Sequence, residues 1–137
     1  MESRLDLAIA LAKKIHKGQV DKQGVEYFKH PETVASFVEG EDAKIVAYLH
    51  DTVEDGDGKI TIAQIREMFG DKIADAVALL TRPKDIPYFD YVRRIKTNKL
   101  ATQVKLADLK HNTLPGRGEI PETLAKRYEK AKQILAE

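Results

Sequence analysis

The chain has no cysteine among its 137 residues and almost no net charge. Without cysteine there is no disulfide, no thiol nucleophile and no thiolate-bound zinc or iron–sulfur site, so any metal must be held by histidine and carboxylate side chains. The 23 basic and 22 acidic residues leave a net charge of +1, which gives no overall field suited to a nucleic-acid polymer as partner. The absence of disulfides fits a cytoplasmic location.

Long apolar runs are also missing. No stretch of 18 apolar residues occurs, so we expect no membrane span. Asp6 interrupts the apolar N-terminal segment and no small-residue cleavage site follows it, so we expect no signal peptide. The hydrophobic content of 42% excludes intrinsic disorder, and the length fits a single domain over residues 1–137.

Apolar residues recur at helical spacing along most of the chain, and no convincing strand alternation is present. The pattern therefore predicts an all-α, compact multi-helix bundle. A long loop at residues 18–30 exceeds the usual length of a connection, and such loops are often functional. The predicted helices cover residues 5–15, 31–38, 42–51, 62–69, 73–80, 88–96, 100–112 and 121–135.

The segment HDTVED, residues 50–55, places one histidine and three acids at the end of an apolar helix. If that helix continues, His50 and Glu54 lie one turn apart, as do Asp51 and Asp55. Two acids at a helix C-terminus oppose the helix dipole, and a cation bound nearby would remove that conflict. The alternative is a polar helix end that binds nothing.

Two further residues extend this group into a candidate metal site. His30 ends the long loop, and Asp108 follows the inward-facing residues Val104 and Ala107 of its helix. A buried carboxylate needs a partner, which here is either a neighbouring lysine or a metal. The candidate ligands are two imidazoles and two carboxylates: His30, His50, Asp51 and Asp108.

This mixed set of nitrogen and oxygen ligands suits Mn²⁺, Fe²⁺, Co²⁺ or Zn²⁺ better than Ca²⁺. Four protein ligands leave positions open on an octahedral ion, and one position could hold water of lowered pKa. Glu54 and Asp55 would then orient or deprotonate that water, or protonate a leaving group.

The remaining motifs give weaker evidence for a functional site. Residues 53–64 resemble an EF-hand loop, but Val53 and Gln64 stand where that loop needs its first ligand and its final bidentate carboxylate. A glycine-rich turn before a helix capped by Thr61 explains the segment more simply. His16 is explained by the dipole of the helix that it ends. His111 is either a surface residue or a contact for an anionic ligand.

Three segments together resemble a known family. The order His…His-Asp…Asp is similar to the signature of HD-superfamily metal-dependent phosphohydrolases. GQVDKQGVEYFKHP, LHDTVEDG and VKLADLKHN resemble three consecutive motifs of the RelA/SpoT-type (p)ppGpp hydrolase domain, particularly its small stand-alone members. The resemblance runs from about Leu7 to Leu114.

The resemblance implies that the four candidate ligands converge on a metal, usually Mn²⁺ in this family, and that Glu54 and Asp55 act on water and phosphate. It implies release of pyrophosphate from the 3′ position of guanosine tetra- or pentaphosphate. Lys22 and Asn112 match family positions that contact the nucleotide. The negative charge of the phosphates would be neutralised by basic side chains, with Lys22, Lys105 and Arg117 as the candidates.

The chain departs from the family pattern at a few positions. Asp21 stands where many alarmone hydrolases carry a basic residue near the base, and a carboxylate does not stack on a base as a guanidinium does. Glu26 replaces a common proline, and the arginine frequent after Asp108 is absent. Two alternatives therefore stay open: hydrolysis of another phosphorylated nucleotide or nucleotide cofactor, and a binding module without turnover. A homo-oligomer is also left open.

Overall fold

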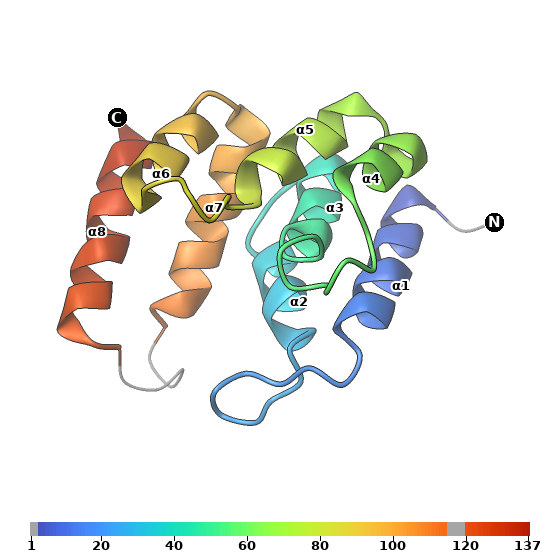
Figure 1. Ribbon diagram of the computed structural model, residues 1–137, viewed down its shortest axis with the longest axis horizontal. Helices are drawn as coiled ribbons and strands as arrows, with labels where there is room; N and C mark the ends of the chain where they lie inside the picture. The colour runs from blue at the N-terminus through green and yellow to red at the C-terminus, as the bar shows by residue number, and fades with distance from the viewer. Residues whose placement is uncertain (1–2, 115–119) are drawn as a thin grey trace.

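The computed structural model describes residues 3–114 and 120–137, which form eight α-helices and no sheet. The all-α prediction is confirmed (Figure 1). An isolated bridge between Val20 and Glu26 lies within the long loop. The helices are α1 (Arg4–His16), α2 (Lys29–Ser36), α3 (Glu41–Leu49), α4 (Ile62–Phe69), α5 (Asp71–Leu80), α6 (Tyr88–Lys96), α7 (Lys99–Asn112) and α8 (Glu122–Ala136).

Local capping explains where several helices begin. Thr61 and Gln64 form the capping box predicted for α4, with each side chain accepting from the other residue's backbone N–H. Ser3 and Asp6 form the same arrangement at α1. Gly70, at φ +92°, separates α4 from α5 in a conformation that favours glycine.

One difference between the predicted and observed helix boundaries affects a site residue. The second helix begins at Lys29 rather than at Pro31, so His30 lies in its first turn. Pro31 is tolerated there because backbone N–H groups of a first helical turn have no partner within the helix. Apolar spacing alone places Met68 of α4 on the buried side with Ile65 and Phe69, but the structure leaves it 41% exposed.

The third helix, predicted over residues 42–51, does not continue through the acidic motif, so the condition for the one-turn spacing of His50 with Glu54 is not met. Helix α3 ends at Leu49, and residues 50–58 form successive turns. The His50 ring and the Thr52 hydroxyl donate to the carbonyls of Ala47 and Leu49, at 2.5 and 2.7 Å, so side chains cap the helix end. The turns then pass so close to one another that only glycine fits at position 56. A Cβ there would lie 2.1 Å from the Thr52 carbonyl oxygen.

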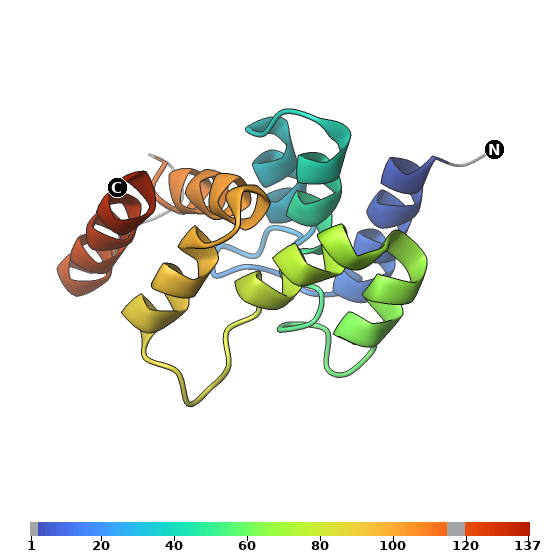
Figure 2. The same cartoon turned by 90° about the horizontal axis from the view of Figure 1, so that it is seen from above.

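Helix α7 lies at the centre of the bundle (Figures 1 and 2). It packs against α2, α3 and α5 on one side and against α6 and α8 on the other. Its inward residues Ala101, Val104 and Leu109 are fully buried. Polar side chains on α7 are therefore brought against the ends of α2 and α3, where the candidate site residues lie.

Candidate metal centre and active site

The long loop between α1 and α2 leads into the first turn of α2, where His30 is buried. Asp21 organises this loop, because its Oδ1 accepts the backbone N–H groups of Gln23 and Val25 at 2.8 and 3.0 Å. The Tyr27 N–H donates to the Gln19 carbonyl at 2.9 Å. Asp21, the departure from the family pattern, thus serves the fold of the loop.

The turn after α3 orients His50. Its Nδ1 faces the Ala47 carbonyl, so Nδ1 carries the proton and Nε2 points into the site. Nε2 is buried and has no well-directed hydrogen bond to any described residue, although Asp51 Oδ2 lies 3.1 Å away. A buried imidazole nitrogen that faces carboxylates and lacks a well-directed hydrogen bond is suited to binding a cation.

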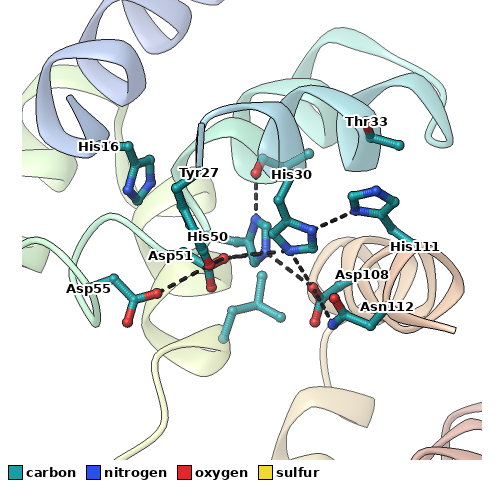
Figure 3. A network of polar contacts seen from close by, with 12 residues as sticks. His16, Tyr27, His30, Thr33, His50, Asp51, Asp55, Asp108, His111 and Asn112 are labelled. Carbon is teal, nitrogen blue, oxygen red and sulfur yellow. Dashed lines mark hydrogen bonds and ion pairs between the residues drawn. The ribbon is translucent and has the colours of Figure 1, made fainter. Parts of the chain in front are cut away.

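Asp108 comes from the central helix and completes the group. Its Oδ1 lies 2.8 Å from His30 Nε2 and 3.5 Å from His50 Nε2. Its Oδ2 is 3.0 Å from the Lys105 ammonium, and Asn112 donates to Oδ1 at 3.3 Å. The structure thus brings together the four predicted ligands, here called the His–Asp cluster: His30, His50, Asp51 and Asp108 (Figure 3).

Opposing charges favour the charged forms of His50, Asp51 and Asp108. Burial acts to raise the pKa of Asp51, but the charge of His50, whose Nε2 lies 3.1 Å away, holds that pKa at about 2. Burial also acts to raise the pKa of Asp108, but the charge of Lys105 and the nearby histidines His30 and His50 lower it well below its usual range. Burial acts to lower the pKa of His50, yet the carboxylates raise it well above its usual value. Without a metal, a proton on His50 supplies positive charge to these carboxylates.

The shift on His50 predicts how stability depends on pH. A histidine whose pKa is raised in the folded state stabilises the fold fully below its unfolded pKa, and this contribution is lost as pH rises through the folded value. Above about pH 6.5, the metal-free protein should lose up to about 1.4 kcal/mol per pH unit. Thermal unfolding scans in chelator should show a falling melting temperature, and His50→Asn should flatten the trend. An equal slope in both proteins would contradict the assignment to His50.

Glu54 and Asp55, here called the acidic pair, lie beside the His–Asp cluster. Glu54 Oε1 accepts the Arg82 backbone N–H at 2.8 Å, and Asp55 Oδ2 accepts the Tyr27 hydroxyl at 3.3 Å. Burial raises the pKa of Glu54, and burial together with the charge of Asp51 raises that of Asp55. Carboxyl groups with raised pKa values are suited to proton transfer near neutral pH.

The cluster and the acidic pair open into one cavity of about 210 Å³. A second cavity of about 190 Å³ adjoins it, and Asn112 lines both. Lys22 lines the second cavity together with Asp21 and the α8 residues Leu124 and Tyr128. The structure thus places Lys22 and Asn112, the two predicted nucleotide contacts, around a single hollow.

Lys105 and Arg117 were the other predicted phosphate contacts. Lys105 lines the first cavity, but its side chain is only 12% exposed and is paired with Asp108. Arg117 lies outside the described residues.

Sequence reasoning missed the contribution of Tyr27. Its hydroxyl donates to Asp51 Oδ2 at 2.6 Å as well as reaching Asp55, and its ring lies between those of His16 and His30. His16 is 2% exposed, and its Nδ1 lies 2.8 Å from Gln19 Oε1. The sequence feature that could have indicated this role is the position of Tyr27 in the long loop, shortly before the predicted ligand His30.

Of the two alternatives left open for His111, the structure excludes a surface position. The side chain is 7% exposed, and its Nδ1 lies 2.7 Å from His30 Nδ1. The nearly parallel rings are 4.9 Å apart, centroid to centroid. Its spacing of one helical turn from Asp108 was the signal that places both residues on one face of α7.

Comparisons with known proteins point to a family and a fold. A family model described as an HD domain matches residues 8–111. A GTP pyrophosphokinase of Myxococcus xanthus is 38% identical over 80 residues, which are 55% of this chain and 10% of that protein. The chain therefore spans about a tenth of the length of that curated relative.

Among solved structures, one described as a metazoan ortholog of SpoT that hydrolyzes ppGpp shares the fold. The TM-score is 0.72 at 20% sequence identity, and the match covers 98% of this chain and 84% of that one. Within the described residues, no helix is both long and apolar enough to cross a membrane.

Proposed function

The chain belongs to the HD domain family of metal-dependent phosphohydrolases, and on that premise we propose that it releases pyrophosphate from the 3′ position of guanosine tetra- or pentaphosphate. The observation that carries the proposal is the buried His–Asp cluster, which shares a cavity with the acidic pair. The geometry supports hydrolysis of a phosphate ester or anhydride, while the relatives named above favour a guanosine polyphosphate.

The residues of the His–Asp cluster fit a divalent cation. Two imidazole Nε2 atoms and two carboxylates face one another, and the buried Nε2 of His50 lacks a well-directed partner among the described residues. We propose Mn²⁺ as the ion, since this ligand set mixes nitrogen with hard oxygen donors. When bound, such an ion supplies Lewis acidity toward water and a phosphoryl oxygen.

The acidic pair supplies proton transfer in this proposal. The oxygen of a water molecule forms the new bond to phosphorus, and the bond from phosphorus to the 3′ oxygen breaks. Glu54 takes the proton of the attacking water, and a carboxyl proton of the pair returns to the 3′ oxygen, so the pair holds the same number of protons before and after. The backbone N–H of Arg82 fixes Glu54, and the Tyr27 hydroxyl fixes Asp55.

The second cavity is proposed to hold the nucleoside. Its wall from α8 is largely apolar, and its loop edge carries Lys22, which is exposed and able to meet phosphate. Lys105 is paired with Asp108 instead, which favours Lys22 as the phosphate contact. Because the two cavities meet at Asn112, a base in one would leave its phosphates near the other.

A substrate panel tests this proposal. Purified protein with Mn²⁺ should release pyrophosphate from ppGpp and pppGpp and leave GDP and GTP. The absence of turnover in protein shown to contain metal would refute the guanosine polyphosphate assignment.

Another phosphorylated nucleotide or nucleotide cofactor is the second candidate substrate. The observation that favours it is the Asp21 carboxylate in the second cavity. Exclusive turnover of ppGpp and pppGpp within the panel would remove this candidate. Nucleotide binding without turnover in any metal would instead indicate a sensor module.

A further inference from the structure

Helix α7 brings a third histidine, His111, against the two histidines of the His–Asp cluster. His111 follows Asp108 by one turn, and its Nδ1 meets the Nδ1 of His30 at 2.7 Å (Figure 3). The opposite nitrogen of His30, Nε2, lies 2.8 Å from Asp108 Oδ1. Both nitrogens of His30 are therefore engaged, one by the cluster and one by His111.

The contact between the two Nδ1 atoms requires one donor and one acceptor, because a single proton lies between them. In the metal-free protein, the short distance to Asp108 favours a proton on His30 Nε2. His30 Nδ1 then carries a lone pair, and His111 must donate. If His30 Nε2 instead binds a cation, the proton of that ring must sit on Nδ1, and His111 must accept.

We propose that His111 is a positioning residue whose hydrogen bond to His30 reverses direction when the metal binds. The inference rests on the ligand assignment made for the proposed function. Each ring stays neutral with one proton in both states. One proton leaves His30 Nε2, the proton between the rings shifts from His111 to His30, and one proton arrives at His111 Nε2. His30 is thereby held in place with and without metal.

His50 shows why the residue type at position 111 matters. Its Nδ1 donates to the Ala47 carbonyl, an acceptor that cannot become a donor. That contact fixes His50 in the metal-binding tautomer permanently. His111 can both donate and accept, because a neutral imidazole exchanges these roles by tautomerisation.

Histidine ¹⁵N NMR tests the reversal directly on the wild-type protein, which has only four histidines. Spectra are compared in chelator and with Zn²⁺, used as a diamagnetic probe. The inference predicts that zinc moves the His111 proton from Nδ1 to Nε2 and the His30 proton from Nε2 to Nδ1. A His111 tautomer unchanged by bound zinc would overturn it.

Zinc affinity in variants gives a second readout that needs no substrate. His111→Leu should weaken zinc binding by about 10- to 100-fold. His111→Asn should retain most of the affinity, because an amide can present either its oxygen or its NH₂ to His30. The same leucine change at His16, a buried histidine whose Nδ1 meets the Gln19 side chain, is the matched control and should leave zinc affinity within a few-fold of the wild-type value.

The outcomes separate two failures. Wild-type affinity in His111→Leu would overturn the role of His111 and leave the ligand assignment intact. Absence of zinc binding by the wild-type protein would refute the ligand assignment and this inference together. If His111→Leu fails to fold, the wild-type spectra and His111→Asn still decide the question.

Discussion

Asp108→Ala is expected to remove the bound metal and abolish most of the activity. Asp108 lies within 3.5 Å of both cluster histidines and forms an ion pair with Lys105. Its loss would delete one proposed metal ligand and leave the buried Lys105 ammonium without its partner. Because a catalytic metal contributes several kcal/mol, turnover should fall on the order of 10³-fold. Metal content by elemental analysis and pyrophosphate release are measured on the same preparation.

Two variants serve as controls for this result. Asp108→Asn keeps the size of the side chain and removes its charge, so it should also lose metal while retaining the fold. Asp90→Ala removes an exposed carboxylate of α6 and should change neither measurement. Unchanged metal content in both Asp108 variants would show that Asp108 is not a ligand.

Glu54→Gln is expected to separate chemistry from metal binding. Glu54 accepts the Arg82 N–H, and no contact of 4 Å or less joins it to a histidine of the cluster among the described residues. The amide keeps this shape but cannot take a proton, so turnover should fall by about 10²- to 10⁴-fold at unchanged metal content.

The pH profile sharpens the test of Glu54. Since burial raises the pKa of Glu54, wild-type activity should fall as pH drops through that raised value. The residual activity of Glu54→Gln should lack the Glu54 contribution to this fall. Glu39→Gln changes another carboxylate, remote from both cavity linings, and is the matched control. Loss of metal from Glu54→Gln would instead make Glu54 a ligand.

The helices were predictable because their signals are local. Apolar spacing, the capping box at Thr61 and the stop at Gly70 all act within a few residues, and each predicted helix has its counterpart in the structure. The end of α3 was not predictable in the same way. The capping contacts of His50 and Thr52 depend on ring and hydroxyl orientations that periodicity does not encode.

The site was predictable in its residues and only partly in its arrangement. A histidine at the end of a loop and an acid on an inward helix face are visible in the sequence, but their meeting depends on the packing of α7 against α2 and α3. Tyr27 and His111 escaped prediction for the same reason. Each gains its role from a partner distant in the chain: Asp51 for Tyr27 and His30 for His111.

Within residues 3–114 and 120–137, two groups of side chains could hold a cation, and they make different predictions. One contains both histidines and Asp51, and the other contains Asp51 with the acidic pair. Anomalous diffraction at the manganese edge, from crystals grown with saturating Mn²⁺, tests the central claim most directly. We predict a single peak between the imidazole Nε2 atoms and the carboxylates of the His–Asp cluster. A peak held by Asp51, Glu54 and Asp55 without histidine, or no peak at the cluster, would contradict the account.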